Sequence, residues 1–499
     1  MYVLVNRTSQ CNPMSQAYIL LYKNSNWQIG KYKFYNYLSL RMGALGRYGF
    51  FIVSTLGLFS AIFWTYISQV PPLPEIKPQW WGPGQPRAVD RSIRPFKINV
   101  SDEVLDDLQD RLELLTTLTP PLEGIGFQYG FNTKYLQEEV VEYWKTKYNW
   151  REQERFLNKF PQFKTCVDGL DIHFIHVKPI SVPEGTEVLP LLLLHGWPGS
   201  VREFYEIIPH LVKPQAGYNF VFEVIVPSLP GYGFSDGAAK PGLGAAQIAV
   251  IMKNLMERIG MQKFIVQGGD WGAVIASNMA TLFPENVKGL HSNACFVQSL
   301  KSTIKLFLGS LWPTFVVEKD YVDKVYPLWE HFQFLLEESG YLHLQATKPD
   351  TIGVALRDSP AGLAAYILEK FSTWTNPAWK SSSDGGLTKK FSLTKLLDNI
   401  MIYWVTGSIT TSARLYSETF TKAQMALELD SIPTAVPSGC TNAPNELMYL
   451  SESLLRDKYV NLIHFSHMKA GGHFLAFEEP QLLADDIWQF VKKLRNIAK

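Results

Sequence analysis

Three short runs of mainly apolar residues predict neighbouring strands of one buried sheet. A strand is apolar along its whole length only where both faces of its sheet are covered, which is typical of parallel strands. Between the second and third runs, apolar residues recur at helical spacing from Ile248 to Ile259, and Gly260 then provides a helix stop. The three runs are VLPLLLL (188–194), FEVIV (222–226) and FIV (264–266).

Alternating strands and helices of this kind predict an α/β fold with a doubly wound sheet. The alternation stops at residues 296–420, which are mostly helical in pattern, rich in aromatic residues and without strand-like runs. We therefore expect a helical cap inserted over the sheet. The sheet pattern resumes in SIPTAV (431–436) and LIHFSHM (462–468), and a last amphipathic helix follows Pro480.

A different kind of segment precedes the α/β region. Residues 49–68, GFFIVSTLGLFSAIFWTYIS, contain no charged residue. About twenty helical residues, at ~1.5 Å each, span the hydrocarbon core of a bilayer. Trp64 and Tyr66 lie near one end, where interfacial aromatic residues are enriched. We interpret this segment as a single membrane anchor, with a buried core helix and a cleaved signal peptide as the alternatives.

The chain between the anchor and the sheet combines a linker with helices. The linker is rich in proline and extended, and the helical stretches are amphipathic, with Ser101 as an expected N-cap. The residues before the anchor show no clear period, and we expect them to be poorly ordered. The predicted organisation is an extension (1–45), the anchor (46–69), a linker and helical region (70–165), the first part of the core (166–295), the cap (296–420) and the second part of the core (421–499).

The charges around the anchor give a first indication of its orientation. More lysine and arginine residues precede the span than follow it, so the positive-inside tendency favours a cytosolic N-terminus and a luminal main body. If translation starts at Met42, most of this bias disappears. Asn99 begins an Asn-Val-Ser glycosylation sequon, whose occupancy would report the side of the membrane.

The composition excludes several classes of protein. A chain of 499 residues with 46% hydrophobic residues can form a large core. A formal net charge of +1 without a basic block gives no reason to expect nucleic-acid binding. The four cysteines, Cys11, Cys166, Cys295 and Cys440, are far apart, which argues against a zinc site and against a disulfide scaffold. Nothing in the sequence reports the oligomeric state.

The motif VQGGDWGAV contains the first candidate for chemistry, Asp270. It follows a predicted strand and precedes a predicted helix, between glycines that permit a tight turn. The helix presents Gly272, Ala276 and Ala280 on one face, so that it can pack closely on the sheet. This strand–turn–helix arrangement is that of a nucleophile elbow, with aspartate in place of the usual serine. The alternative is that Asp270 only caps the helix.

Two further residues complete the pattern of a hydrolase. An elbow of this kind is followed along the chain by an acid and then a histidine. His473, in AGGHFLAFEEP, follows the last predicted strand, where the general base is expected. Glu446, in APNELMYL, precedes that strand and is the candidate for the acid that orients the imidazole. The alternatives for the acid are Asp430, Glu452 and Asp457.

The loop HGWPGS, after the first strand, is a candidate oxyanion site. The backbone N–H of Trp197 in this loop and that of Trp271, after Asp270, could both donate to a developing oxyanion. Ser200 and Glu203 have the spacing of a capping box for the next helix. The alternative is a plain turn before that helix.

The motifs HGWPGS, PSLPGYGFSDG, GGDWG and GGHFLAFEEP resemble those of the membrane-bound, microsomal-type epoxide hydrolases of the α/β-hydrolase superfamily. The likeness covers residues 46–499 and includes WWGPG, RPFKI and a long stretch of the cap. It implies Asp270 as the nucleophile, His473 as the base and Glu446 as its acid partner. It further implies that Tyr341 and Tyr416 of the cap hold the epoxide oxygen.

The resemblance also implies a reaction and a location. Lipophilic epoxides, xenobiotic or lipid, are converted to vicinal diols through a covalent aspartyl ester, which water then hydrolyses. The implied partners are the epoxide, water and the lipid around the anchor, and neither a cofactor nor a metal is required. The implied location is the endoplasmic reticulum membrane with a cytosolic catalytic body, which is opposite to the charge bias of the N-terminus.

Two other functions remain open on the same fold. A haloalkane dehalogenase shares an aspartate nucleophile followed by tryptophan, and Trp271 would then bind halide. The cap tyrosines and the microsomal-type N-terminal region argue against it. A non-catalytic ligand receptor would be indicated by a broken triad, whereas every expected position is filled.

Overall fold

The computed structural model describes residues 48–497. The predictions about the extension 1–45 and about a start at Met42 concern residues outside this range. The chain divides into two compact units, Met1–Gln69 and Val70–Lys499. In the first unit, a helix covers Tyr48–Ile67, as the apolar run predicts. Among the described residues it is the one helix that is long and apolar enough to cross a membrane.

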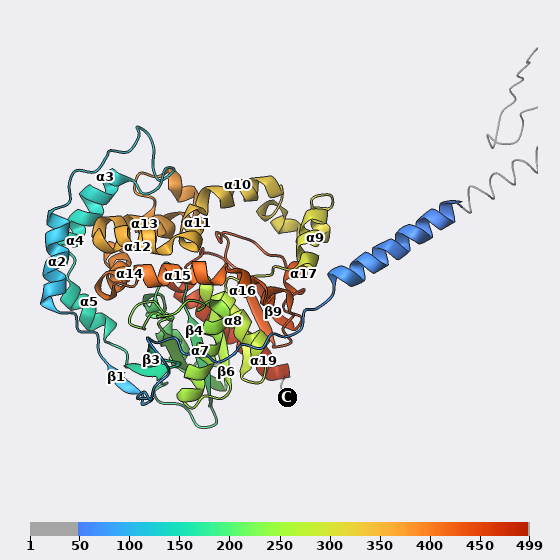
Figure 1. Ribbon diagram of the computed structural model, residues 1–499, viewed down its shortest axis with the longest axis horizontal. Helices are drawn as coiled ribbons and strands as arrows, with labels where there is room; N and C mark the ends of the chain where they lie inside the picture. Colours follow the sequence, from blue (N-terminus) through green and yellow to red (C-terminus); the bar gives the residue numbers. More distant parts are fainter. Residues whose placement is uncertain (1–47, 498–499) are drawn as a thin grey trace, which may run out of the picture. The chain divides into compact units, whose positions relative to one another are not determined.

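One mixed sheet forms the centre of the second unit (Figure 1). Its parallel strands are β4 (Glu187–Leu194), β5 (Phe220–Pro227), β6 (Phe264–Gly268), β7 (Val287–Ser292), β8 (Ser438–Asn442) and β9 (Leu462–His467). The antiparallel strands are β1 (Arg94–Phe96), β2 (Gln162–Val167) and β3 (Leu170–Val177).

The order of the strands is β1-β2-β3-β5-β4-β6-β7-β8-β9 within the described residues. The three apolar runs form β5, β4 and β6 in the middle of the sheet, and β4 pairs in parallel with both of the others. This confirms the predicted parallel core. These strands are apolar along most of their length because both of their faces are covered by packed side chains.

Four helices of the core pack against the sheet. As predicted, α7 ends before Gly260, whose φ of +90° lies in the left-handed region that favours glycine. In α8 the predicted small-residue face is buried, and a Cβ added to Gly272 would lie 2.1 Å from the carbonyl oxygen of Leu194 in β4. The four helices are α6 (Ile208–Val212), α7 (Ala245–Arg258), α8 (Trp271–Leu282) and α19 (Pro480–Ile497).

The N-terminal part of the second unit is helical, as expected, and contacts the cap. Its helices are α2 (Asp102–Glu113), α3 (Thr133–Tyr135), η1 (Leu136–Val141), α4 (Glu142–Thr146) and α5 (Trp150–Leu157). Ser101 is the N-cap of α2, although its side chain accepts no capping hydrogen bond. Arg111 of α2 donates to Asp358, and Tyr143 of α4 hydrogen-bonds Thr394, so this region joins the cap at two places.

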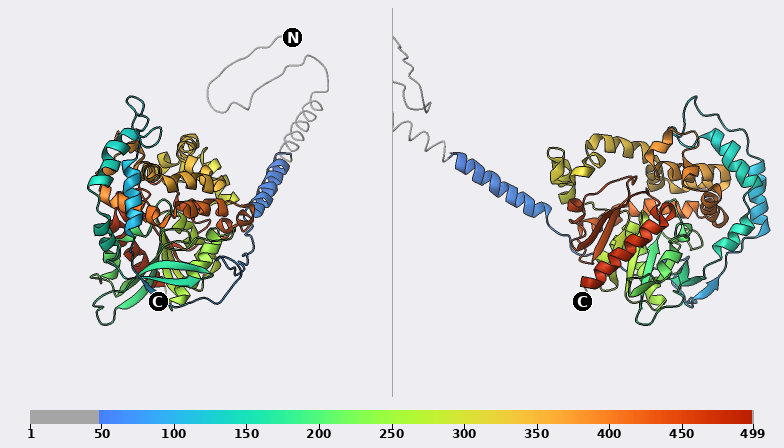
Figure 2. Two further views of the ribbon diagram at one scale, coloured as in Figure 1. Left: turned by 60° about the vertical axis from the view of Figure 1, so that its left-hand side comes forward. Right: turned by 180° about the vertical axis from the view of Figure 1, so that it is seen from behind.

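Residues 296–420 contain no strand, and their helices form a layer on one side of the sheet (Figures 1 and 2). Figure 2 shows this layer from two further directions. The α-helices are α9 (Leu300–Gly309), α10 (Leu328–Glu338), α11 (Gly340–Thr347), α12 (Pro349–Asp358), α13 (Pro360–Thr373), α14 (Leu393–Thr406) and α15 (Ile409–Thr419). Short 3₁₀ turns between them are η3 (Pro313–Phe315), η4 (Lys319–Lys324), η5 (Pro377–Ser381) and η6 (Leu387–Lys389).

The strand predicted at 431–436 is wrong. That segment forms only an isolated bridge, Thr434 to Tyr459, after the turn η7 (Leu429–Ser431), and the strand β8 begins at Ser438. Pro433 removes a backbone donor from the predicted segment, and Pro437 directly after it removes another. The sequence of β8, SGCTN, is small and polar, so hydrophobicity gives no signal for it even though four of its five residues are buried.

The spacing of the cysteines argues against a disulfide scaffold, but one pair is bonded. Cys295, after β7, is bonded to Cys440 in β8, with 5.8 Å between the Cα atoms. The two strands are adjacent in the sheet, although 145 residues separate the cysteines in the sequence. Sequence spacing carried no information on this pairing because the intervening cap is an insertion that returns the chain to the neighbouring strand.

The close approach of α8 to β4 predicts a large effect of a single methyl group. Gly272→Ala should lower the free energy of unfolding by about 1–3 kcal/mol, because the new Cβ forces the helix away from the Leu194 carbonyl. Gly340→Ala is the matched control, since a Cβ there meets nothing within 4 Å. Denaturant unfolding of both variants measures the difference, and equal stability would contradict the close approach.

Candidate active site

Asp270 occupies the sharp turn between β6 and α8. Its φ of 51° and ψ of −130° place a non-glycine residue in a region that L side chains rarely adopt. Such a conformation costs on the order of 1–3 kcal/mol and persists only where the surrounding structure imposes it. The strain fits an elbow that presents the carboxylate, since an ordinary N-cap residue has extended backbone angles.

Glycines around this turn allow the backbone segments to meet. A Cβ at Gly268 would lie 2.3 Å from the carbonyl oxygen of Gly272. A Cβ at Gly196, in the loop after β4, would lie 2.1 Å from Oδ1 of Asp270. The Asp270 carboxylate is therefore pressed against the HGWPGS loop, a contact that only a residue without a side chain permits.

The structure brings Asp270, His473 and Glu446 together from three distant parts of the chain. Nε2 of His473 lies 3.2 Å from Oδ2 of Asp270. Nδ1 of His473 lies 2.7 Å from Oε1 of Glu446, which also accepts the backbone N–H of Leu447 at 2.9 Å. The imidazole is thus held between two carboxylates, in the order expected for nucleophile, base and orienting acid.

The two carboxylates decide the protonation of the imidazole. Burial by itself favours the neutral ring, but the charges and hydrogen bonds of Glu446 and Asp270 outweigh it and raise the pKa of His473 well above the ordinary 6.5. In the resting site the two carboxylates therefore favour the protonated imidazole. Any event that neutralises Asp270 removes one of the groups that hold this proton.

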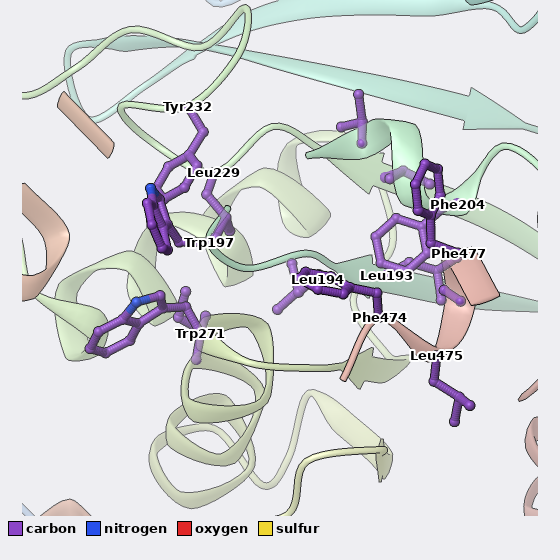
Figure 3. Close-up of a cluster of buried hydrophobic side chains, with 14 of the residues drawn as sticks. Leu193, Leu194, Trp197, Phe204, Leu229, Tyr232, Trp271, Phe474, Leu475 and Phe477 are labelled. Carbon is purple, nitrogen blue, oxygen red and sulfur yellow. The ribbon is translucent and has the colours of Figure 1, made fainter. Parts of the chain in front are cut away.

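The predicted oxyanion donors lie on the two sides of Asp270. The backbone N–H of Trp197 donates to Oδ1 of Asp270 at 2.8 Å. Trp271 is the first residue of α8, so its N–H is one of the free donors at a helix start. The indoles of these two residues lie near each other beside the end of β4, whereas Phe204 and Phe477 lie on its other side (Figure 3).

The two cap tyrosines lie over this turn. Tyr341, from α11, stacks on Trp197 with 5.0 Å between the ring centroids and an angle of 6°. Tyr416, from α15, contacts Trp271 edge to face at 4.8 Å and Tyr341 at 5.8 Å. The hydroxyl of Tyr416 is buried and makes no hydrogen bond of normal geometry with the described residues. A buried O–H donor without a partner is suited to bind a ligand oxygen.

The environment keeps both phenols protonated. Burial, reinforced by the charge of Asp270, raises the pKa of Tyr341 far above 10. Burial likewise raises the pKa of Tyr416, and Tyr341 and Asp270 add to the effect. Both hydroxyls can therefore donate hydrogen bonds at neutral pH.

One residue of the site, Glu203, was read from the sequence only as part of a capping box. The turn η2 (Val201–Phe204) is a single 3₁₀ turn, in which the hydroxyl oxygen of Ser200 accepts the N–H of Arg202, while the N–H of Glu203 donates to the backbone carbonyl of Ser200. The Glu203 carboxyl faces a cavity of about 20 Å³ that is also lined by Asp270 and His473. This volume is about that needed for one water molecule. Burial raises the pKa of Glu203 to about 8, so the carboxyl is largely protonated at neutral pH.

Glu478 is a second residue whose position the sequence did not reveal. Its carboxylate oxygens accept the backbone N–H groups of Gly472 and Phe474, at 2.7 and 2.9 Å, on the two sides of His473. The side chain is buried, and burial raises its pKa to about 8. The motif GGHFLAFEEP thus contains both the histidine and the residue that fixes its loop.

The alternative acids lie elsewhere. Asp457 pairs with Lys301 and Lys305, and Glu452 pairs with Arg456. Near Asp430, burial lowers the pKa of Lys458 to about 8, and the charge of Asp430 opposes this effect. None of the three contacts His473 among the interactions of the described residues, so Glu446 is the acid that geometry selects.

The other histidines considered from the sequence have structural surroundings. His195 is fully buried, accepts the N–H of Leu229 at 3.1 Å, and has its pKa lowered to about 4 by burial. His464 is buried and shares the carboxylate of Asp486 with His291, each at 2.9 Å. His467 stacks on Tyr321, with 4.0 Å between the ring centroids.

Comparisons with known proteins agree with this geometry. A family model described as epoxide hydrolase N terminus matches residues 93–204, and one described as alpha/beta hydrolase fold matches residues 190–427. The chain is 59% identical over 437 residues to juvenile hormone epoxide hydrolase 1 of Ctenocephalides felis. This match covers 87% of this chain and 94% of the relative. It is 50% identical over 423 residues to epoxide hydrolase 1 of Sus scrofa, covering 84% and 93%.

A solved structure extends the likeness to three dimensions. The crystal structure of juvenile hormone epoxide hydrolase from the silkworm Bombyx mori matches with a TM-score of 0.82 at 50% sequence identity. The match covers 85% of this chain and 99% of the silkworm chain. The sheet, the cap and the N-terminal region described above therefore belong to one shared architecture.

The charge pattern around His473 predicts the result of removing one carboxylate. Asp270→Asn should lower the pKa of the imidazole by at least ~1 pH unit, because one of its two charged partners becomes neutral. Histidine-selective NMR titration of the full chain measures this. His173, whose pKa burial lowers to about 3, should stay neutral in both forms and serves as the internal control. An unchanged His473 pKa would contradict the proposed ion pair.

Proposed function

The chain belongs to the epoxide hydrolases of the α/β hydrolase superfamily, and on this premise we propose that it forms a covalent ester between Asp270 and its substrate. The hydrolysis of epoxides to diols is the activity of this family. The observation that carries the proposed mechanism is the strained Asp270 turn, with His473 on one carboxylate oxygen and the Trp197 N–H on the other.

In the first step, Oδ2 of Asp270 attacks a ring carbon of the epoxide. Carbon–oxygen cleavage transfers negative charge to the ring oxygen, which Tyr341 and Tyr416 stabilise through their O–H groups. The support for this role is their burial over the turn and their high pKa, which keeps both donors protonated. The ring oxygen gains a proton overall, and the imidazolium of His473 is the acid available to supply it.

Ester formation prepares the second step electrostatically. When Asp270 becomes a neutral ester, the His473 proton loses one of its two stabilising charges, so the pKa of the imidazole falls. The neutral imidazole then takes a proton from water as the water attacks the ester carbon. The Oδ1 atom, which accepts the Trp197 N–H, becomes the oxyanion, and we assign the free N–H of Trp271 as its second donor. As the intermediate breaks down, the ester C–O bond is cleaved and the leaving oxygen takes the proton of the added hydroxyl, which restores the carboxylate and releases the diol.

The one-water cavity supports a position for the attacking water. It lies between Asp270, His473 and Glu203. We assign to Glu203 the role of a positioning residue, whose protonated carboxyl hydrogen-bonds the water while His473 acts as the base. His473 therefore returns to its starting protonation state after one turnover, because it gives up one proton during ring opening and regains one during hydrolysis.

The proposed substrates are lipophilic epoxides, and we include juvenile hormone among them. The support is the naming of the flea and silkworm relatives, at 59% and 50% identity, as juvenile hormone epoxide hydrolases. Xenobiotic epoxides remain a second class, since the pig relative is epoxide hydrolase 1. Parallel turnover of juvenile hormone and aromatic epoxides, with the diols identified by mass spectrometry, ranks the two classes by kcat/KM.

We further propose that helix Tyr48–Ile67 anchors the protein in the endoplasmic reticulum membrane with a cytosolic catalytic body. The exposed Asn99 sequon would then remain without glycan, and glycosylation at this site would overturn the orientation. The Cys295–Cys440 disulfide counts against this orientation, because disulfides are typical of an oxidising, luminal environment. Thiol labelling of the native microsomal protein therefore supplies an independent test of the same orientation.

His473→Gln should stop the reaction after the first step and trap the ester. Ring opening should be slower, because the ring oxygen must take its proton from water and not from the imidazolium. Ester hydrolysis has no base at all, so the covalent adduct still accumulates on the intact nucleophile. Intact-mass analysis after incubation with an epoxide should show an increase by the mass of one substrate. Asp270→Asn is the control that forms no adduct. Normal turnover without an adduct in His473→Gln would contradict the assigned roles.

Tyr341→Phe should slow ring opening much more than ester hydrolysis. One of the two O–H donors to the ring oxygen is lost, which corresponds to a rate reduction on the order of 10²-fold. Single-turnover stopped-flow fluorescence can follow ester formation through Trp197 and Trp271. Tyr129 is exposed, so Tyr129→Phe is the matched control and should leave the rates of both steps unchanged. A selective loss in ester hydrolysis would assign Tyr341 to the other step.

A further inference from the structure

A group of large apolar side chains on the cap is exposed. We name it the cap apolar surface. In α9 and the turn after it, Leu311, Trp312 and Phe315 are 85%, 73% and 85% exposed. In α10, Trp329 and Leu336 are also more than half exposed. The complete set is Phe307, Leu308, Leu311, Trp312, Phe315, Trp329, Phe332 and Leu336.

These side chains lie in neighbouring segments of the cap. The helices α9 and α10, drawn in yellow, lie next to each other at the edge of the cap (Figures 1 and 2). The hydroxyl of Tyr326, just before α10, donates to the carbonyl of Leu306 in α9 at 2.8 Å and joins the two. Within α10, Trp329, Phe332 and Leu336 follow the i, i+3, i+7 spacing of one helix face.

The exposed area exceeds what a soluble surface normally carries. Five of the eight side chains are aromatic, and each of these is more than half exposed. An aromatic side chain has roughly 150–250 Å² of surface, so the exposed area of the five is about 500 Å². Patches of this size on a monomer mark a site of interaction with a partner or a membrane. We therefore expect the cap apolar surface to be covered by a partner or by a membrane.

We propose that the occupant is the membrane interface, and that the cap docks on the same bilayer that holds the anchor; this inference rests on the anchor proposed above. The residue types are those of interfacial contacts, since Trp, Phe and Leu predominate. Lys301 and Lys305 of this region pair with Asp457, and α10 carries three glutamates, so apolar contact and not charge supplies the attraction.

The linker leads the chain to this part of the body. Ile76 packs against Leu429 and Ile432, and Ser431 between them donates to the carbonyl of Gln298, just before α9. From Ile76 to the end of the first unit at Gln69 is seven residues, which reach at most about 25 Å. The anchor therefore joins the body through a short stretch of chain that ends where Ile76 packs.

Docking at this surface would connect the lipid phase with the active site. Leu336 of α10 and Tyr341 of α11 are five residues apart, and only Ser339 separates the two helices. A lipophilic epoxide dissolved in the bilayer would thus meet the cap directly beside one of the tyrosines that are proposed to bind its oxygen. A protein partner would have no comparable reason to approach the substrate-binding helix.

The test places an environment-sensitive fluorophore on the surface of the full chain. An NBD label is attached to Phe315→Cys in a Cys11→Ser background; Cys166 is buried and the other two cysteines are bonded. The protein is reconstituted into phosphatidylcholine vesicles with a minor fraction of phosphatidylserine and of headgroup-proximal doxyl lipid. The matched control is Ile180→Cys, equally exposed in the β3–β4 loop at the opposite end of the strands from Asp270.

We expect a blue-shifted emission and about twofold quenching by the doxyl lipid at position 315, and neither at position 180. A chain that floats with the vesicles but shows no quenching at position 315 retains its anchor and overturns the docking. Failure to float, with an unquenched label, overturns both proposals. A shift that depends on protein density without quenching indicates a second copy or another protein as the occupant and also overturns the docking.

A kinetic variant gives an independent readout. Trp312→Ser combined with Phe315→Ser should raise the apparent KM for an epoxide supplied in vesicles by about threefold or more, with kcat unchanged. For a water-soluble epoxide the same variant should behave as the parent. An equal effect on both substrates would indicate a general loss of structure and would contradict the docking, as would no effect on either.

Discussion

The active site depends on one close approach between two turns of the sheet. The backbone after β6 meets the loop after β4 so tightly that Gly196, Gly268 and Gly272 have no room for a Cβ. This contact imposes the positive φ of Asp270 and directs its carboxylate at the Trp197 N–H. The cost of the strained residue, on the order of 1–3 kcal/mol, is offset by the packing of α8 and β4 around it. Every proposed chemical role follows from that carboxylate position.

The electrostatics of the site follow from the same arrangement. Because Asp270 is fixed close to His473, the imidazole lies between two carboxylates and carries a proton in the resting enzyme. The same proximity couples the charge of the nucleophile to the basicity of the base. A single neutralisation at Asp270 therefore changes the state of His473 at the moment when a base becomes necessary, without any movement of the chain.

The cap provides hydrogen-bond donors that the sheet does not provide. Its tyrosines are donors that burial keeps protonated, and their rings pack on the two tryptophans beside Asp270. The N-terminal region contacts the cap through Arg111 and Tyr143, and the outer edge of the cap carries the apolar surface proposed to meet the membrane. Chemistry, cap position and access for a lipophilic substrate are thus parts of one arrangement.

The sequence by itself determined the local features, because apolar periodicity, glycine placement and the membrane-length run act over a few neighbouring residues. The parallel core, α7, the Asp270 elbow and the span Tyr48–Ile67 are of this kind. The strand β8, the Cys295–Cys440 bond and the one-water cavity at Glu203 were decided only by the tertiary structure. Each of these arises where segments far apart in the chain come into contact, and a small polar strand, a cysteine or a buried glutamate carries no local signal of the neighbour it will meet.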